Sequence, residues 1–188
     1  MNKVQFERRE YQLKIAEKAS KANTLVVLPT GLGKTLIAAM VAKKRLEKHP
    51  QTRILILAPT RPLAAQHKET FEKFLKREVF LVTGKVNLEK RKEMYQVAKI
   101  ISATPQVILN DLKRKILSLS DFSLIVFDEA HRAVKDYAYV PIAKEYYKTS
   151  RYSLILGLTA SPGSSRERID EVCNCLLYTS DAADDGES

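Results

Sequence analysis

The stretch that most constrains this chain is a short apolar run that breaks into a glycine-rich turn and then into a helical pattern. Residues 25–28 are apolar, and the turn after them reads Pro29-Thr30-Gly31-Leu32-Gly33-Lys34-Thr35. Glycines let a backbone turn tightly and bring its N–H groups close to a polyphosphate, and the N-terminus of the following helix attracts the same anion. Lys34 adds a positive charge, and the Thr35 hydroxyl suits Mg²⁺, which prefers oxygen ligands. The stretch therefore predicts a strand, a phosphate-binding loop and a helix, although Leu28 stands where the longer general pattern has its first glycine.

Similar apolar runs and helical patterns alternate along the rest of the chain. Strands are predicted at 25–28, 53–58, 79–83, 99–102, 123–127 and 154–158, and helices at 6–21, 33–48, 63–75, 87–98, 105–114, 137–147 and from about 165. This alternation predicts an α/β fold with one open, mostly parallel sheet and helices on both faces. Ligands of such folds bind beyond the carboxyl ends of the strands. The segments expected at that edge are 29–35, 59–61, 104–106, 128–131 and 159–161.

Two carboxylates, Asp128 and Glu129, directly follow the apolar run 123–127. One of them can hold Mg²⁺ opposite Thr35, and the other can orient and activate the water that attacks a γ-phosphoryl group. An acidic pair after a strand is ordinarily a solvated turn. Its combination with a phosphate-binding loop upstream favours a nucleotide-hydrolysing site instead.

The charge of the chain points to polyanionic partners. Its 188 residues suffice for one domain with a full core, and 32 Lys and Arg residues against 22 Asp and Glu residues give a formal net charge of +10. No apolar run approaches the roughly 20 residues of a membrane span, so we expect an intracellular protein without a membrane partner. Cys173 and Cys175, with three scattered histidines, do not form a metal-binding pattern.

Three segments resemble motifs I, II and III of superfamily 2 helicases of the DEAH-box type. They are Pro29-Thr-Gly-Leu-Gly-Lys-Thr35, Asp128-Glu-Ala-His131 and Thr159-Ala-Ser161. The flanking residues, including Leu57-Ala-Pro-Thr-Arg-Pro-Leu63, are similar to the branch that contains the archaeal Hef helicase/nuclease and the Fanconi anaemia group M translocase. The resemblance covers about Arg8 to Cys173 and implies a RecA-like P-loop NTPase domain over 1–174.

The resemblance also implies a role for each matching residue. The implied catalytic residues are Lys34, Asp128 and Glu129. The implied ATP-binding residues are Arg9 and Gln12 at the adenine, with Thr30, Gly31, Leu32, Gly33, Lys34 and Thr35 at the phosphates. Mg²⁺ would be held by Thr35 and Asp128. The implied contacts to a nucleic-acid backbone are Arg61, Thr83, Gly84, Thr104 and Gln106, and His131, Thr159 and Ser161 would couple the two sites.

This family implies an ATP- and Mg²⁺-dependent helicase or translocase that acts on forked or branched DNA in repair, in the cytoplasm with the nucleoid. An RNA-directed member of the superfamily stays open, because contacts to the sugar-phosphate backbone barely distinguish RNA from DNA. A nucleotide-binding scaffold without catalysis is a further alternative, against which Lys34, Asp128 and Glu129 argue.

Helicases of this kind close ATP between two RecA-like domains, the second of which supplies an arginine. We expect that second domain to be absent from these 188 residues, so that the chain alone hydrolyses ATP poorly. Residues 175–188 abandon the family pattern, and the last ten carry Asp181, Asp184, Asp185 and Glu187 without a basic residue. We expect them to form an acidic tail that is non-native or disordered.

Overall fold

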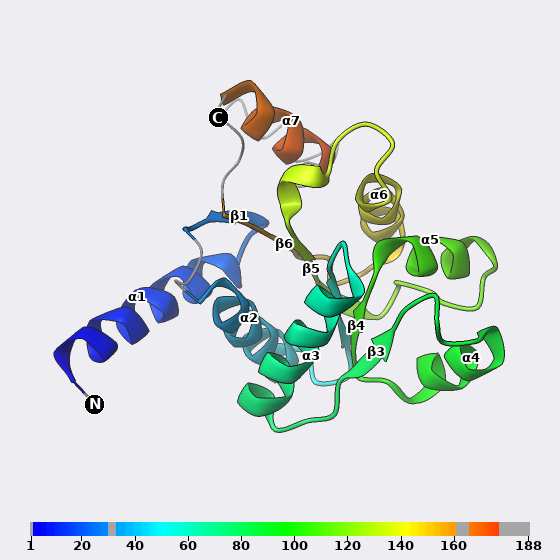
Figure 1. Cartoon of the computed structure of the whole chain (residues 1–188), viewed down its shortest axis with the longest axis horizontal. Helices are drawn as coiled ribbons and strands as arrows, with labels where there is room; N and C mark the ends of the chain where they lie inside the picture. Colours follow the sequence, from blue (N-terminus) through cyan, green and yellow to red (C-terminus); the bar gives the residue numbers. More distant parts are fainter. Residues whose placement is uncertain (1, 30–32, 161–165, 177–188) are drawn as a thin grey trace.

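The sheet of this protein is entirely parallel in the part of the chain that the computed structural model describes, residues 2–29, 33–160 and 166–176 (Figure 1). Six strands lie in the order β1-β6-β5-β2-β4-β3. Their bounds are Thr24–Val27 (β1), Arg53–Leu57 (β2), Phe80–Val82 (β3), Ile100–Ala103 (β4), Phe122–Asp128 (β5) and Ile155–Thr159 (β6). The predicted α/β class and the parallel sheet are confirmed.

The described residues also form seven α-helices and one short 3₁₀ helix, of which the first precedes β1 and the last follows β6. They are α1 (Lys3–Ala19), α2 (Lys34–Lys48), α3 (Arg61–Leu75), α4 (Leu88–Val97), α5 (Pro105–Lys113), η1 (Ala130–Arg132), α6 (Tyr139–Thr149) and α7 (Arg166–Leu176). The first helix begins earlier than predicted, because Asn2 caps it by accepting a hydrogen bond from the Gln5 backbone N–H at 2.8 Å.

The last helix extends slightly beyond the expected domain boundary at residue 174. It continues through Leu176, whose side chain is buried and whose carbonyl accepts a hydrogen bond from the Tyr147 hydroxyl at 2.8 Å. The two residues Cys175 and Leu176 therefore belong to the packed domain. The rest of the expected acidic tail, 177–188, lies outside the described residues.

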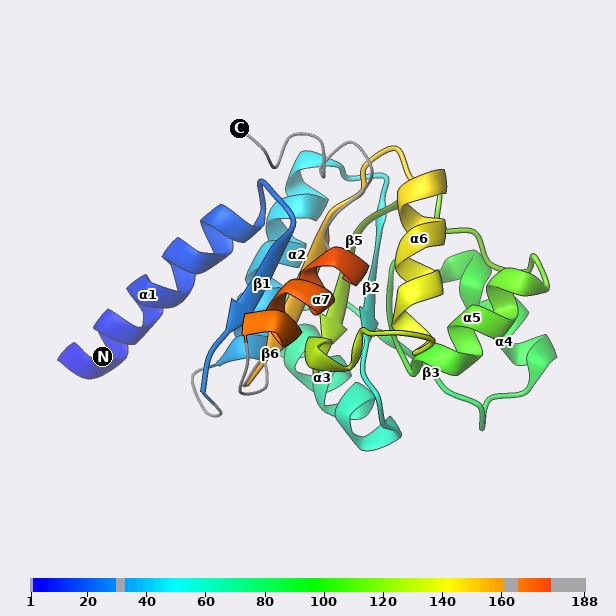
Figure 2. The same ribbon diagram turned by 90° about the horizontal axis from the view of Figure 1, so that it is seen from above.

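Helices cover both faces of the sheet (Figure 2), and alternate strand residues contribute to a hydrophobic layer on each face. In β2, Leu55 and Leu57 face a layer that includes residues of α4 to α7, whereas Ile54 and Ile56 face a layer that includes residues of α1 to α3. This alternation follows from the two-residue period of a strand. It explains why most residues of the predicted strands are apolar, since both faces of the sheet are covered.

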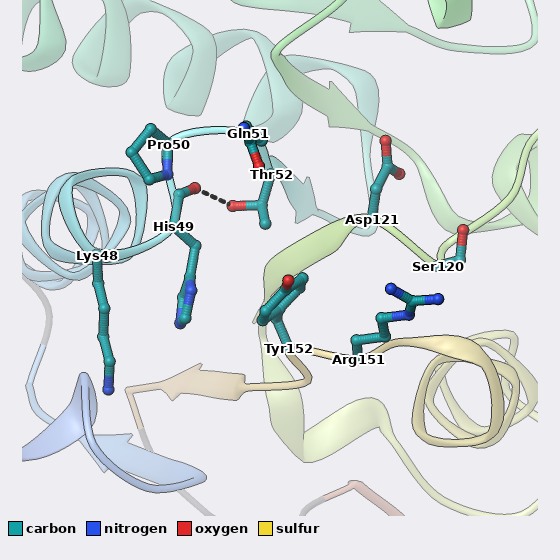
Figure 3. Close-up of a pocket in the computed structure, with 9 residues that line it drawn as sticks. All are labelled: Lys48, His49, Pro50, Gln51, Thr52, Ser120, Asp121, Arg151 and Tyr152. Atoms are coloured by element: carbon teal, nitrogen blue, oxygen red, sulfur yellow. Dashed lines mark hydrogen bonds between the residues drawn. The ribbon is translucent and has the colours of Figure 1, made fainter.

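A polar pocket of about 420 Å³ lies at the amino ends of β2 and β5 (Figure 3). The turn from α2 into β2 forms one wall, where the Thr52 hydroxyl donates to the His49 carbonyl at 2.7 Å. None of the residues expected to bind nucleotide or nucleic acid lines this pocket. None of the helices in the described ranges is long and apolar enough to span a bilayer.

Candidate active site

A cavity of about 520 Å³ lies at the carboxyl edge of the sheet, where the sequence places the nucleotide site. Four segments line it: the start of α2, one side of α3, the end of β5 with the residues after it, and the residue after β6. Its lining residues are Gly33, Lys34, Thr35, Leu63, Gln66, Asp128, Glu129, His131 and Ala160. The fold thus brings the described part of the glycine-rich turn and the acidic pair to one cavity.

The backbone at the start of α2 requires glycine. Gly33 has φ +76°, in the left-handed region, and a Cβ atom added there would lie 2.2 Å from Gln12 Nε2. Beside it, Lys34 Nζ donates to the Leu28 carbonyl at 3.2 Å, so that the lysine side chain points back toward the residue that follows β1. Three other residues assigned to the phosphates, Thr30, Gly31 and Leu32, lie outside the described residues.

The Asp128 carboxylate is held at both oxygens. Oδ1 accepts from the Glu129 backbone N–H at 2.8 Å, and Oδ2 lies 2.7 Å from His67 Nε2. Burial by itself raises the pKa of Asp128, but the hydrogen bonds from His67 and Glu129 and the charge of Lys34 together hold that pKa below its ordinary value. Asp128 is therefore an ionised carboxylate at neutral pH.

The oxygen atoms at this cavity fit Mg²⁺. The Thr35 hydroxyl and the Asp128 carboxylate line it together, and Mg²⁺ is usually held by one or two protein oxygens with nucleotide phosphates and water. No cluster of three or more His, Cys, Asp or Glu side chains suited to a metal occurs within the described ranges. A phosphate-bound Mg²⁺ does not need such a cluster.

Glu129 adopts an uncommon backbone conformation next to this cavity. Its φ of 48° and ψ of 50° place a non-glycine residue in the left-handed region, which costs about 1–3 kcal/mol and is frequent at functional sites. The Glu129 carboxylate accepts from Arg132 Nε at 2.8 Å, and this contact raises the pKa of Arg132. The contact between Arg132 and Glu129 was not predicted from the sequence.

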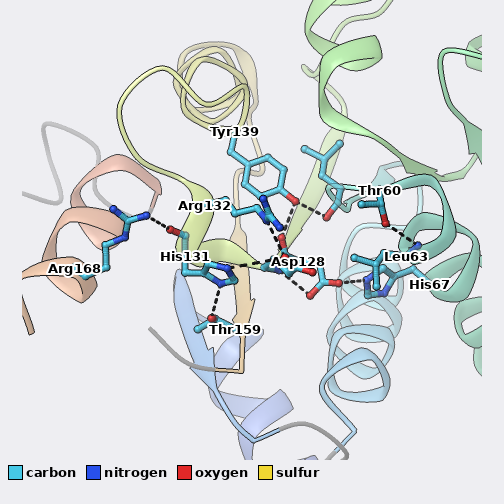
Figure 4. Close-up of polar contacts among 11 residues, drawn as sticks. Thr60, Leu63, His67, Asp128, His131, Arg132, Tyr139, Thr159 and Arg168 are labelled. Atoms are coloured by element: carbon cyan, nitrogen blue, oxygen red, sulfur yellow. Dashed lines mark hydrogen bonds and ion pairs between the residues drawn. The ribbon is translucent and has the colours of Figure 1, made fainter. Parts of the chain in front are cut away.

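Two of the three expected coupling residues lie in contact. His131 Nδ1 is 3.1 Å from Thr159 Oγ1, so the residues after β5 and the end of β6 are joined (Figure 4). The His131 carbonyl also accepts from Arg168 Nη2 in α7, at 3.1 Å. Ser161, the third, lies outside the described residues.

The expected adenine residues lie at a neighbouring pocket of about 390 Å³. Arg9 and Gln12 line it together with Gly33, which also lines the phosphate cavity. Gln12 is buried, with 4% of its surface exposed. The two pockets therefore adjoin at Gly33, as binding of one nucleotide across both would need.

The expected nucleic-acid residues follow three strands that neighbour one another in the sheet. Arg61 follows β2, Thr104 and Gln106 follow β4, and Thr83 and Gly84 follow β3. Thr83 is buried, and its hydroxyl accepts from the Lys85 backbone N–H at 3.3 Å, so that this side chain shapes its own turn. The five residues form a row along the carboxyl edge that leads away from the cavity.

Tyr139 and His67 also belong to the site, although the sequence did not mark them. The Tyr139 hydroxyl donates to the carbonyls of Asp128 at 2.7 Å and Leu57 at 3.2 Å, and thereby ties the ends of β5 and β2 together. His67 appears in the sequence only as part of the buried face of a helix. A histidine on such a face was the one available signal.

The parallel sheet, the left-handed glycine at the start of α2 and the strand-end acidic pair define a RecA-like P-loop nucleotide-binding domain. Residues 9–169 match the model of the DEAD/DEAH box helicase family, so the chain belongs to that family. The expected family membership is thereby confirmed.

Individual relatives agree with this assignment. A Methanocaldococcus jannaschii protein named as an ATP-dependent RNA helicase is 43% identical over 91% of this chain and 22% of its own length. The mouse Fanconi anemia group M protein homolog is 37% identical over 90% of this chain and 8% of its own length. Further relatives, from fungi and a fly, are named ATP-dependent DNA helicases. The chain spans less than a quarter of the length of the Methanocaldococcus protein and of the mouse protein.

A solved structure extends the likeness to three dimensions. The Pyrococcus furiosus Hef helicase domain superposes with a TM-score of 0.84 and 52% identity, over 88% of this chain and 35% of that one. The resemblance to the branch containing Hef and the Fanconi anaemia group M translocase is thus confirmed.

Proposed function

We propose that this chain is the ATP-binding domain of an ATP-dependent helicase or translocase that acts on forked or branched DNA in repair. The observation that carries the proposal is the convergence of Lys34, Thr35, Asp128 and Glu129 on one cavity. The names of the DNA helicases among the relatives support the choice of DNA. Such an enzyme works where the chromosome lies, so we also propose an association with the nucleoid.

The residues of the cavity divide the work of ATP hydrolysis between them. Lys34 exchanges its contact with the Leu28 carbonyl for the phosphates. Thr35 and Asp128 would hold Mg²⁺, which would neutralise negative charge on the phosphates. Glu129 accepts a proton from the attacking water, whose oxygen forms a bond to the γ-phosphorus as the bond to ADP breaks. Arg9 and Gln12 receive the adenine.

The backbone of one nucleic-acid strand lies along the row formed by Arg61, Thr104, Gln106, Thr83 and Gly84. Thr83, whose side chain is buried, shapes the turn that carries Gly84. Arg61 supplies a charge, and helix N-termini with backbone N–H groups suit phosphate oxygens without reading sequence. The net charge of +10 favours such a partner. Since one relative bears the name of an RNA helicase, an RNA-directed enzyme is the second candidate.

Full activity requires more than this domain. The relatives are several times longer than the chain, and enzymes of this class complete their ATP site with an arginine from a second RecA-like domain. We therefore propose that the 188 residues bind Mg²⁺–ATP and DNA weakly and turn ATP over slowly.

Binding measurements on the purified chain test the proposal. A fluorescent ATP analogue should bind in the presence of Mg²⁺, and EDTA or the variant Lys34→Ala should weaken that binding at least about tenfold. Labelled forked DNA, duplex DNA and an RNA hairpin are then compared at one salt concentration. Tightest binding of the fork supports the proposal, whereas preference for RNA supports the second candidate. Magnesium-independent nucleotide binding would contradict the assigned roles of Thr35 and Asp128.

A further inference from the structure

The contact between His67 and Asp128 joins two parts of the molecule that the proposed function uses separately. His67 lies on α3 and Asp128 at the end of β5, and Nε2 and Oδ2 are 2.7 Å apart (Figure 4). The His67 side chain is 3% exposed and that of Asp128 is 14% exposed. The contact therefore lies mostly in the interior of the protein. A hydrogen bond to a charged group is stronger there than in water.

The direction of this hydrogen bond follows from the charge of Asp128. A carboxyl group is ordinarily ionised at neutral pH, and the oxygens of a carboxylate only accept, so at 2.7 Å His67 donates from Nε2. The other ring nitrogen, Nδ1, is buried and has no hydrogen-bond partner among the described residues. The polar character of this buried ring is thus directed at Asp128 alone, as expected for a side chain that orients a carboxylate.

The helix that carries His67 also carries an expected contact to the nucleic-acid strand. Thr60 caps α3, with the Leu63 N–H donating to its hydroxyl at 3.4 Å, and Arg61 is the first helical residue. Arg61 and His67 are separated by about 9 Å along the helix axis, at 1.5 Å per residue. Leu63 and Gln66, between them, line the nucleotide cavity.

A second contact connects α3 with the next segment that is expected to contact the nucleic acid. The Ser102 hydroxyl of β4 donates to the Ala64 carbonyl at 2.7 Å, in the interior of the domain. β4 leads directly into Thr104 and Gln106, which belong to the same expected row. The first turns of α3 are thus connected to both expected nucleic-acid-binding segments, the one that begins at Arg61 and the one that follows β4. His67, on the same helix, contacts Asp128.

We propose that His67 is a positioning residue that couples the binding of a nucleic-acid strand at the start of α3 to the orientation of Asp128 in the nucleotide site. The inference rests on the proposed function and adds a path by which the nucleic-acid site and the nucleotide site influence each other. The expected coupling residues His131 and Thr159 instead join the segment after β5 to the end of β6.

Such coupling is reciprocal. A strand that pulls on α3 changes how well Asp128 holds Mg²⁺, and a bound Mg²⁺–nucleotide changes the affinity for the strand by the same factor. Without the His67 donor, Asp128 keeps its hydrogen bond from the Glu129 backbone N–H but loses its hydrogen bond to α3. The two sites then respond to their ligands independently.

Two pairs of variants test the inference. His67→Gln places an amide nitrogen the same number of bonds from Cβ as Nε2, whereas His67→Asn ends at the position of Nδ1 and cannot reach Asp128. His67→Phe keeps the ring shape without a donor. His49→Phe is the matched control, because His49 lies at the end of α2, far from the cavity, and packs against Tyr152.

The measured quantity is the affinity for a labelled DNA single strand, with and without a non-hydrolysable ATP analogue and Mg²⁺. In the unchanged chain we expect the two affinities to differ at least about fivefold. In His67→Asn and His67→Phe this factor should fall to about one, and the Mg²⁺ concentration needed for nucleotide binding should rise about tenfold. DNA affinity without nucleotide should stay within about twofold, and His67→Gln and His49→Phe should behave like the unchanged chain.

The outcomes separate this inference from the function on which it rests. If His67→Asn keeps the coupling factor, or if His67→Gln loses it as fully as His67→Asn, the positioning role is wrong while the nucleotide site stands. If the unchanged chain shows no Mg²⁺-dependent nucleotide binding, the proposed function fails first. Thermal unfolding of each variant shows whether it is folded, and the Gln and Asn pair decides the question if the Phe variant is not.

Discussion

Replacing Tyr139 by phenylalanine tests whether the nucleotide site depends on the hydrogen bonds that connect the ends of β2 and β5. The side chain is fully buried, and its hydroxyl donates to the Asp128 and Leu57 carbonyls at 2.7 and 3.2 Å. Burial raises the pKa of Tyr139 well above its ordinary value, so the hydroxyl is protonated and can donate at neutral pH. Phenylalanine preserves the edge-on packing against Phe127, with ring centroids 4.9 Å apart, and removes only the hydrogen bonds.

The expected loss of stability is about 1–2 kcal/mol, the usual cost of removing a buried hydrogen bond and leaving its acceptor unpaired. For a chain of this length that lowers the melting temperature by roughly 2–8 °C. The freed carbonyl belongs to Asp128 itself, so nucleotide affinity should also fall, by about threefold to tenfold if up to 1.4 kcal/mol of the loss is felt as poorer positioning of that residue.

Tyr146→Phe provides the matched control on the same helix. Tyr146 is equally buried, donates to the Phe122 carbonyl at 2.9 Å and accepts from the Leu154 N–H at 3.0 Å. These contacts lie at the amino ends of β5 and β6, opposite the cavity. Thermal unfolding followed by circular dichroism, with Mg²⁺-dependent binding of a fluorescent ATP analogue, measures both effects. We expect Tyr146→Phe to lower stability at least as much and to leave nucleotide affinity unchanged.

Two results would refute this reasoning. Equal losses of nucleotide affinity in the two variants would mean that lower stability of the whole domain weakens the site, and not the loss of the Tyr139 hydrogen bonds at the ends of β2 and β5. An unchanged melting temperature for Tyr139→Phe would mean that its hydroxyl contributes no net stability.

Three further variants address other parts of the domain. Gly33→Ala should weaken nucleotide binding at least tenfold in fluorescence titrations, because the left-handed φ costs about 1–2 kcal/mol and the new methyl group would displace Gln12. Glu129→Gln should leave that binding within about twofold and lower single-turnover ATP hydrolysis by roughly 100-fold or more. Asp111→Asn should lower the unfolding free energy by about 3–5 kcal/mol, because Arg91 then loses its buried partner, bound at 2.7 and 2.9 Å. Burial raises the pKa of Asp111, but hydrogen bonds from Arg91 and Tyr95 hold it below its ordinary value, so its contribution is present above about pH 4 and lost as the pH falls further. Acid titrations of stability should accordingly be flatter below pH 4 in the variant, and an identical acid slope would contradict the assignment.

The order of helices and strands was predictable because each element carries its own local signal. The apolar runs end at proline, serine, threonine or aspartate, and the helices repeat their apolar positions with the helical period. The short helix η1 was not predicted, since it begins after Glu129 in a left-handed conformation that no local pattern requires. The start of α1 was misplaced because the Asn2 cap precedes the first apolar repeat.

The row of expected nucleic-acid residues illustrates what order along the chain leaves undecided. Arg61, Thr83 and Thr104 occur in that sequence along the chain, but β4 lies between β2 and β3 in the sheet. The segment after β4 therefore stands between the other two. Strand order depends on which crossovers pack together, and the composition of a single strand does not specify its neighbours.

The sequence by itself determined the glycine-rich turn, the acidic pair and the strand ends on which they lie, because these features are local and chemically specific. Only the tertiary structure decided what surrounds Asp128. Its partner His67 is 61 positions away in the chain, and Tyr139 reaches its carbonyl from another helix. Periodicity shows that His67 faces inward, but the atom it meets there depends on how α3 packs over β2 and β4, next to the end of β5. A hydrogen bond requires both direction and distance, and those are fixed only when the layers of the domain come together.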